Sequence, residues 1–142
     1  MANKKRILVV DDHAPTRALV RSILEAEKYE NFEIVEAGTG TDCLKAMDKK
    51  GPFDLILLDV NLPDMDGYSV CRALRTVEAK VPIVFVTGKG DIKDYAEGRA
   101  AGADSYLVKP IARAALRSIV GLFTSVERSQ RKDKGEAELT QK

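Results

Sequence analysis

The sequence has few of the residues that build disulfide scaffolds, thiolate metal sites or membrane anchors. Its 142 residues include two cysteines, one histidine and no tryptophan. Cys43 and Cys71 are too few for a disulfide framework and lack the spacing of metal ligands, so we expect both to be reduced packing residues. No apolar run is long enough to cross a bilayer, and the apolar stretch near the N-terminus is too short for a signal peptide. We therefore expect a soluble, cytoplasmic protein without a membrane partner.

An excess of charge of one sign is also lacking. Lys and Arg number 23 and Asp and Glu number 22, for a formal net charge of +1. A nearly neutral chain is not attracted as a whole to nucleic acid or to an anionic membrane, so we expect no direct nucleic-acid partner. What the chain does have is 44% hydrophobic residues in a length that fits one domain with its own core.

Short apolar runs alternate with longer segments of helical period, which is typical of a parallel sheet flanked by helices. Strands are predicted at residues 7–10, 32–35, 55–58, 83–86 and 106–108. Four runs are continuously apolar, as expected for strands buried on both faces, whereas the second partly alternates and suits a sheet edge. The predicted fold class is α/β: a doubly wound, five-stranded parallel sheet of order 2-1-3-4-5 with five flanking helices.

Capping and turn residues mark the intervening helices. Pro15 suits a first helical turn, Thr39 starts a capping box, and Asp66 and Asp91 can cap the third and fourth helices. Gly98 weakens the fourth helix. The apolar spacing predicts these inward-facing residues: Leu19, Ile23 and Ala26 in the first helix with Val20 and Leu24 beside them, Val70, Leu74 and Val77 in the third, and Ile92, Tyr95, Ala96 and Ala100 in the fourth.

The fifth helix, residues 111–126, is apolar over about half its circumference. That surface either packs against the first helix or is exposed to a partner, and both readings stay open. Residues 127–142 are charged and nearly without apolar side chains, which predicts a C-terminal tail or linker after a domain at 5–126.

Polar chemistry follows each of the four continuously apolar strands. Asp11 and Asp12 follow the first, Asp59 the third, Thr87 the fourth and Lys109 the fifth. The carboxyl ends of parallel strands share one edge of the sheet, and ligands bind where the strand order reverses, which lies between the first and third strands. Residues distant in sequence are therefore predicted to share one cleft.

Three carboxylates and one ammonium in such a cleft favour a divalent cation. Oxygen ligands without nearby His or Cys favour Mg²⁺, with Mn²⁺ as an alternative. The Thr87 hydroxyl, the Lys109 ammonium and the unobstructed Gly88 amide suit an incoming phosphoryl group. A carboxylate among them can attack phosphorus and form an acyl phosphate.

These residues and their spacing resemble the motifs of two-component response regulator receiver domains. The resemblance spans about residues 5–126 and is carried by Asp11-Asp12, the stretch LILLDVNLPDMDG at 55–67, Thr87-Gly88 and Tyr106-Leu-Val-Lys109-Pro110. It implies Asp59 as phospho-acceptor, Lys109 as a contact of the phosphoryl group, and Thr87 and Tyr106 as a switch pair. The implied metal ligands are Asp12, Asp59, the Asn61 backbone carbonyl and, through a water, Asp11.

The resemblance also implies the partners and the mode of action. A receiver accepts a phosphoryl group from a histidine kinase or a histidine phosphotransfer protein, or slowly from acetyl phosphate, and is not a metabolic enzyme. Its output is implied to be a downstream protein bound at the surface of the fourth helix, fifth strand and fifth helix, where a homodimer is also compatible. Asn61 and Lys89 are expected to set phosphoryl lifetime, and the Lys109–Pro110 peptide bond is expected to be cis.

Two alternatives stay open. A haloacid-dehalogenase-type phosphatase or phosphotransferase also uses a nucleophilic Asp with Mg²⁺, but Asn61 stands where that class would have a second Asp. A phosphorylation-independent interaction module would not need the acidic cluster. His13 is expected at the rim of the site, and Asp64 and Asp66 are expected to be turn and cap residues.

Overall fold

The computed structural model describes residues 4–26, 31–88 and 92–125, with the backbone alone for 92–94. The predictions for Lys89, Asp91, the Ile92 side chain and residues 127–142 lie outside this description. The strands are β1 (Lys5–Val10), β2 (Phe32–Ala37), β3 (Leu55–Asp59), β4 (Ile83–Thr87) and β5 (Ser105–Val108). The helices are α1 (Ala14–Glu25), α2 (Gly40–Lys50), α3 (Gly67–Val77), α4 (Ile92–Ala101) and α5 (Arg113–Thr124).

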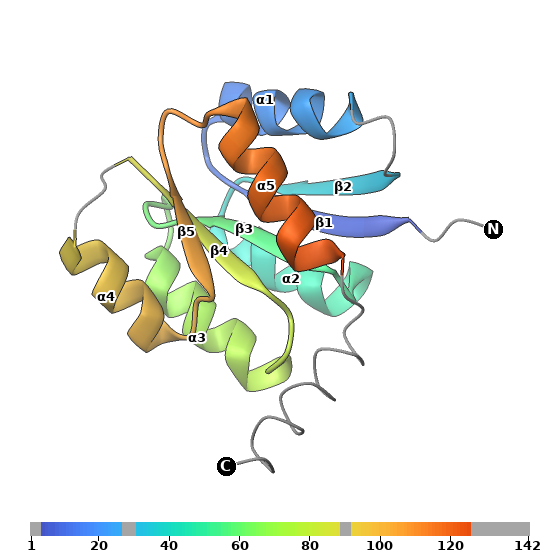
Figure 1. Ribbon diagram of the computed structural model, residues 1–142. Helices are drawn as coiled ribbons and strands as arrows, with labels where there is room; N and C mark the ends of the chain where they lie inside the picture. The colour runs from blue at the N-terminus through green and yellow to red at the C-terminus, as the bar shows by residue number, and fades with distance from the viewer. Residues whose placement is uncertain (1–3, 27–30, 89–91, 126–142) are drawn as a thin grey trace, which may run out of the picture.

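The strands form one parallel sheet in the order β2-β1-β3-β4-β5, as predicted (Figure 1). β1 pairs with β2 on one side and with β3 on the other, so the strand order reverses there. The chain crosses from each strand to the next through a helix, and every strand therefore ends at the same edge. None of the helices in the described part of the chain has the length and hydropathy to cross a membrane.

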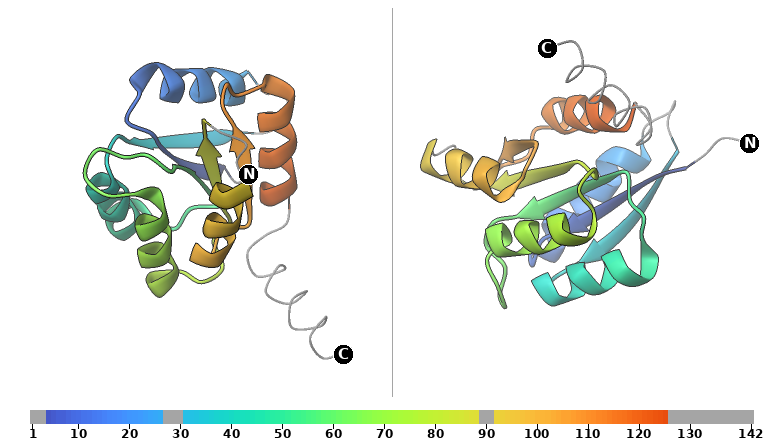
Figure 2. Two further views of the ribbon diagram at one scale, coloured as in Figure 1. Left: turned by 90° about the vertical axis from the view of Figure 1, so that its left-hand side faces the viewer. Right: turned by 90° about the horizontal axis from the view of Figure 1, so that it is seen from below.

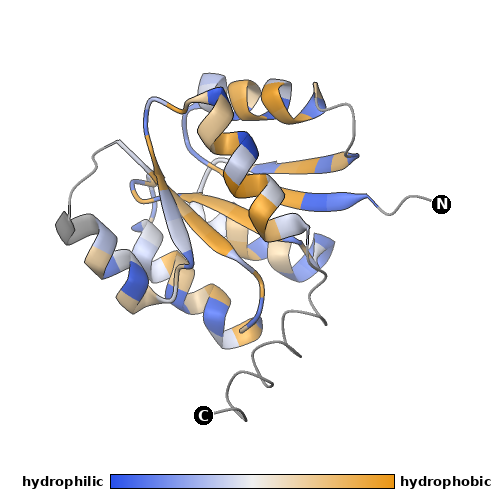
Figure 3. Cartoon of the chain, viewed as in Figure 1, coloured by the Kyte–Doolittle hydropathy of each residue, from blue (hydrophilic) through white to orange (hydrophobic). Residues whose placement is uncertain are grey.

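Helices cover both faces of the sheet (Figure 2). α1 and α5 pack on one face, and α2, α3 and α4 pack on the other. Side chains of the central strands alternate between the two faces, so that Leu8 and Val10 join the α2–α4 side while Ile7 and Val9 join the α1–α5 side. The centre of the sheet is the most hydrophobic part of the molecule (Figure 3). The central strands are apolar on both faces because each face of the sheet packs against its own hydrophobic core.

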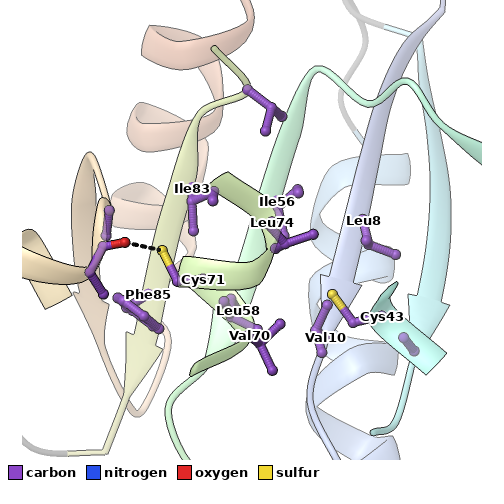
Figure 4. Packing of buried hydrophobic residues seen from close by; sticks show 14 of the residues in the cluster. Leu8, Val10, Cys43, Ile56, Leu58, Val70, Cys71, Leu74, Ile83 and Phe85 are labelled. Atoms are coloured by element: carbon purple, nitrogen blue, oxygen red, sulfur yellow. Dashed lines mark hydrogen bonds between the residues drawn. The ribbon is translucent and has the colours of Figure 1, made fainter. Parts of the chain in front are cut away.

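Both cysteines lie in the core beneath α2 and α3 (Figure 4). Burial raises the pKa of the Cys43 thiol to about 12 and that of Cys71 to about 11, so both stay protonated at neutral pH. The Cys71 thiol lies 3.4 Å from the Ala101 carbonyl oxygen and links α3 to α4. They are free packing residues, as predicted.

The surface of the fifth helix divides between core and solvent. Leu116 and Val120 are buried in the cluster that includes α1, whereas Leu122 is 65% exposed. Packing against the sheet and α1 therefore accounts for one side of the helix, and the Leu122 side stays open to solvent. The helix is also shorter than predicted, because it begins at Arg113.

One strand and several helix residues that were predicted to be buried are exposed instead. β5 is an edge strand with only Leu107 buried, so it is not covered on both faces. Leu19 is 45% exposed because the buried face of α1 is centred on Val20, Ile23 and Leu24. Val77 is exposed at the last turn of α3. Ala26, Tyr95, Ala96 and Ala100 are exposed as well.

Among residues 95–101 of α4, whose side chains the structure describes, the buried ones are small: Gly98 and Ala101. A Cβ atom added to Gly98 would lie 2.9 Å from the Phe85 ring, which is too close for an unmoved side chain. Gly98 thus lets α4 approach Phe85 of β4, and the ring of Phe85 itself packs against Tyr68 of α3. A helical pattern of apolar residues therefore predicts the wrong buried face for a helix that approaches the sheet through glycine.

Candidate functional site

The polar residues that follow the strands meet at one edge of the sheet. Val10 is opposite Leu58 in the β1–β3 register, which places Asp11 and Asp59 side by side at the reversal of strand order. Thr87 is opposite Val108 in the β4–β5 register, so Lys109 follows directly beyond Thr87. The backbone N–H of Lys109 donates to the Thr87 carbonyl oxygen at 2.6 Å. The fold thus brings together residues up to about a hundred positions apart.

Three carboxylates form the centre of this edge. Asp11, Asp12 and Asp59 each offer an oxygen within 4.8 Å of the others. Asp11 and Asp59 are buried, at 3% and 4% exposure, whereas Asp12 faces solvent. The cluster is therefore closed below and open on the Asp12 side.

The Lys109 ammonium contacts both buried carboxylates. Its Nζ lies 2.8 Å from Asp11 Oδ2 and 3.2 Å from Asp59 Oδ2. Burial opposes the charge of Lys109, but its hydrogen bond to Asp11 and the charges of both carboxylates outweigh that effect and raise its pKa. Lys109 therefore stays charged at neutral pH and compensates part of the negative charge.

Backbone amides hold the other carboxylate oxygens. The His13 amide donates to Asp11 Oδ1 at 2.8 Å, and the Asn61 amide donates to Asp59 Oδ1 at 3.1 Å. Despite these contacts, burial raises the pKa of Asp59 above its ordinary value, and the charge of Asp11 adds to that effect. Ionisation of Asp59 is thus less favourable in this position than in water.

This donor set fits a hard divalent cation. The three carboxylates and Lys109 sum to −2 when all are ionised, and the grouped ligand atoms are all oxygens. Mg²⁺ binds through one or two carboxylates and keeps several waters, which the open Asp12 side can accommodate. The Asn61 backbone follows Asp59 by two residues and lies in the same exposed loop.

Local sequence fixes the loop between β3 and α3. Asp66 caps α3, because its Oδ1 accepts the Ser69 amide at 2.8 Å. The Gly67 amide donates to the Val60 carbonyl at 2.7 Å, and a Cβ on Gly67 would lie 2.3 Å from the Asp59 carbonyl oxygen. Only glycine fits here without moving the backbone that carries Asp59.

Thr87, Gly88 and Tyr106 lie beside the carboxylates towards α4. Thr87 is 4% exposed, and Gly88 is exposed with open space around its Cα. Tyr106 is half-buried and packs against Tyr95 of α4, with ring centroids 4.8 Å apart. The two tyrosines and Thr87 line a small, mostly apolar recess between β4, β5 and α4.

His13 lies at the rim, as expected from its position. Its side chain is exposed, and its Nδ1 is 2.7 Å from Thr16 Oγ1. The Lys109–Pro110 peptide bond is cis, in agreement with the expectation, and so is Gly51–Pro52.

Sequence reasoning missed two residues that support the site. Arg17 lies on α1, where its guanidinium donates to the Asp11 carbonyl oxygen and pairs with Glu36 at 2.9 Å. Asp64 was expected to be a turn residue, but its carboxylate binds the first turn of α2. Neither contact has a local sequence signal, because each joins separate elements.

The chain matches the family model of the response regulator receiver domain over residues 7–121. It is 44% identical over 108 residues to the transcriptional regulatory protein ResD of Bacillus subtilis (strain 168), covering 76% of this chain and 43% of that protein. The chain thus spans less than half the length of that relative.

Solved structures agree with the family match. A CheY-like response regulator receiver domain protein from Methanospirillum hungatei JF-1 superimposes with a TM-score of 0.78 at 30% identity, over 92% of this chain and 99% of that one. The receiver domain of sensor histidine kinase PA1611 from Pseudomonas aeruginosa PAO1, with a magnesium ion coordinated in its active site cleft, gives a TM-score of 0.77 at 27% identity. It covers 87% of this chain and 100% of that one.

Proposed function

Because the chain belongs to the response regulator receiver domain family, we propose that it accepts a phosphoryl group on Asp59 and thereby changes its partner-binding surface. The observation that carries this proposal is the buried Asp59 carboxylate, grouped with Asp11 and Asp12 and contacted by Lys109. A partly compensated carboxylate at a topological switch point is suited to react with an incoming phosphoryl group.

In the proposed reaction an Asp59 oxygen attacks the phosphorus of a phosphohistidine. The new P–O bond gives an acyl phosphate, the P–N bond breaks, and the imidazole leaves with the electron pair. Lys109, 3.2 Å from Asp59 Oδ2, stabilises the negative charge of the transferred group. The exposed Gly88 amide and the Thr87 hydroxyl are the proposed further donors.

Magnesium is the proposed cofactor, with Mn²⁺ as an alternative. The proposed ligands are Asp12, Asp59 and the Asn61 backbone carbonyl, with Asp11 acting through a water. When bound, the ion supplies positive charge that offsets the carboxylates and the phosphoryl oxygens. The grouped carboxylate oxygens support this proposal, as does the magnesium ion in the similar PA1611 receiver domain.

The proposed switch couples Asp59 to Tyr106 through Thr87. The phosphoryl group carries close to two negative charges in place of the single charge of the Asp59 carboxylate. It draws the Thr87 hydroxyl towards it, which leaves space for the Tyr106 ring to turn inward. A change from about 1% to about 99% active form requires roughly 5.5 kcal/mol of differential stabilisation. Several charge-assisted hydrogen bonds are enough to supply it.

The proposed partners are a histidine kinase or a histidine phosphotransfer protein as donor, and a downstream protein at the surface of α4, β5 and α5. The side of α5 that carries exposed Leu122 is compatible with such a contact, and with a homodimer. ResD is a transcriptional regulatory protein and MtrA a DNA-binding response regulator. This chain matches less than half of the length of each, so their output is no guide to this chain's partner. Asn61 is proposed to set the access of water to the acyl phosphate, and so is Lys89.

No observation favours the haloacid-dehalogenase alternative, and none of the comparisons supports it. That alternative and the proposed receiver differ in turnover. A generic phosphomonoester is expected to give no repeated turnover with this chain, because the proposed product stays on Asp59.

The test is intact mass spectrometry after incubation with acetyl phosphate, with Mg²⁺ and with a chelator. The wild-type chain should gain one phosphoryl group only with Mg²⁺, and Asp59→Asn should gain none. Size-exclusion chromatography of the modified form then reports whether it dimerises. A phosphoryl group retained by Asp59→Asn, or none on the wild type, would refute the proposal.

A further inference from the structure

The loop between β3 and α3 is attached to α2 as well as to its own flanking elements. Asp64 Oδ1 accepts the Gly40 amide at 2.7 Å, and Oδ2 accepts the Thr41 amide at 2.9 Å and the Thr41 hydroxyl at 2.7 Å. The next residue packs against the same turn, since a Cβ on Gly40 would lie 2.3 Å from Met65 Cγ. Two successive loop residues therefore contact the start of α2.

These contacts provide hydrogen-bond acceptors for backbone amides in the first turn of α2, which have no acceptor within the helix. The first four amides of a helix lack such partners, and the positive end of the helix dipole favours an anion there. Thr39 Oγ1 accepts the Asp42 amide, as in an ordinary N-cap, and the Gly40 and Thr41 amides are left for Asp64. The hydrogen bonds from the Thr41 hydroxyl and from these amides lower the pKa of Asp64 to about 2, so the contact stays charged at neutral pH.

The same loop begins at Asp59 and carries Asn61. Near its start it is held by the hydrogen bond from Asn61 to Asp59 and by a bridge between Asn61 and Asp66. These restraints tie Asn61 to the end of β3 and to the cap of α3. Asp64 adds a restraint from a third element, α2, which packs on the sheet through Cys43 and Ala46 and also contacts α3.

We propose that Asp64 is a positioning residue for the Asp59 site, which holds Asn61 at a fixed distance from Asp12 by anchoring the loop to α2. This inference rests on the proposed function. Mg²⁺ demands nearly ideal octahedral geometry, so small displacements of one ligand weaken binding. Outer-shell groups that touch a ligand directly change metal affinity by roughly 10–100-fold, and a loop anchor acts less strongly.

The test measures Mg²⁺ affinity by NMR titration of backbone amides in the wild type, three single variants and one double variant. Asp64→Ala removes all the hydrogen bonds between the loop and α2 that Asp64 accepts. Thr41→Val changes the α2 side of the contact and removes only the hydrogen bond from the Thr41 hydroxyl. Asp54→Ala is the matched control, because Asp54 also accepts a backbone amide, that of Arg6 at 2.7 Å, but precedes β3 at the other end of the sheet.

We expect Mg²⁺ affinity to fall about fivefold in Asp64→Ala and about twofold in Thr41→Val. The double variant should be no weaker than Asp64→Ala alone, since both changes remove the same link. The rate of phosphorylation by acetyl phosphate should recover to near the wild-type value at saturating Mg²⁺. Asp54→Ala should lower stability while leaving Mg²⁺ affinity unchanged.

The outcomes separate this inference from the proposed function. If the wild type binds no Mg²⁺ and gains no phosphoryl group, the proposed function fails, and this inference fails with it. If the wild type does both but Asp64→Ala and Thr41→Val bind Mg²⁺ as Asp54→Ala does, Asp64 only stabilises the fold and this inference is overturned. Because Thr41→Val is a mild change distant from the carboxylates, the test holds even if Asp64→Ala folds poorly.

Discussion

Replacing Lys109 with methionine tests whether its ammonium compensates the buried carboxylates. The change removes the contacts at 2.8 Å to Asp11 and 3.2 Å to Asp59 and keeps most of the side-chain volume. Removing one partner of a fully buried ion pair costs about 3–5 kcal/mol. The Lys109 side chain is 26% exposed, so solvent screens part of that cost, and we expect the metal-free variant to lose about 2 kcal/mol of unfolding free energy.

The pH of the measurement follows from the raised pKa of Lys109. A raised pKa means that its contribution is complete below the unfolded pKa of about 10.4 and is lost as pH rises through the folded value. Urea unfolding at pH 7.5 therefore measures the whole effect. Arg75→Met is the control, because it removes an ion pair of 2.9 Å with Asp104 at the opposite edge of the sheet.

Magnesium should reverse most of this loss. With Lys109 gone, the three carboxylates sum to −3 rather than −2 when ionised, and we expect Mg²⁺ to bind about tenfold more tightly, a gain of about 1.4 kcal/mol. The stability deficit should then shrink by the same amount at saturating Mg²⁺. Phosphorylation by acetyl phosphate should nevertheless fall, because Lys109 is the proposed contact of the phosphoryl group. The reasoning would be refuted if Lys109→Met were as stable as the wild type without Mg²⁺. It would also be refuted if Mg²⁺ left the stability loss of Lys109→Met unchanged, as we expect for Arg75→Met.

Two further outcomes follow from the same site. Burial and the charge of Asp11 raise the pKa of Asp59, so ionising Asp59 destabilises the metal-free fold as pH rises. Asp59→Asn should therefore be more stable than the wild type at pH 7 without Mg²⁺, and in urea titrations from pH 7 to pH 4 its advantage should shrink; an advantage that stays constant with pH contradicts this. Gly67→Ala should cost about 2 kcal/mol or more in urea unfolding, since its Cβ would lie 2.3 Å from the Asp59 carbonyl and 2.7 Å from Val60 Cα, and a loss below about 0.5 kcal/mol would show that this loop shifts easily.

Local signals in the sequence predicted the elements well. The helix caps at Thr39 and Asp66 form as expected, because a capping side chain bonds an amide only three residues away. The apolar runs predicted all five strands to within two residues at each end, since strand residues that face a core must be apolar. Such signals act over a few residues and need no knowledge of the rest of the chain.

Helix faces were predicted less well, because they depend on what each helix packs against. The inward side of α4 is set by the Phe85 ring, which admits Gly98 and no larger residue without a shift. Leu19 and Val77 have the right spacing for burial but are exposed, because the buried face of α1 is centred on Val20, Ile23 and Leu24 and because Val77 is the last residue of α3. Periodicity locates an apolar stripe, and the neighbouring element decides which part of it is covered.

By itself the sequence determined the order of the elements, the strand ends to within two residues, and the chemical character of the residue that follows each continuously apolar strand. Only the tertiary structure decided which of these residues touch: Lys109 contacts both Asp11 and Asp59, Arg17 holds the Asp11 carbonyl, and Asp64 anchors the loop after Asp59 to α2. The physical reason is the distance along the chain over which each kind of interaction acts. Caps and periodicity arise from interactions within one or two turns of chain, whereas these contacts join elements that meet only when the sheet has assembled.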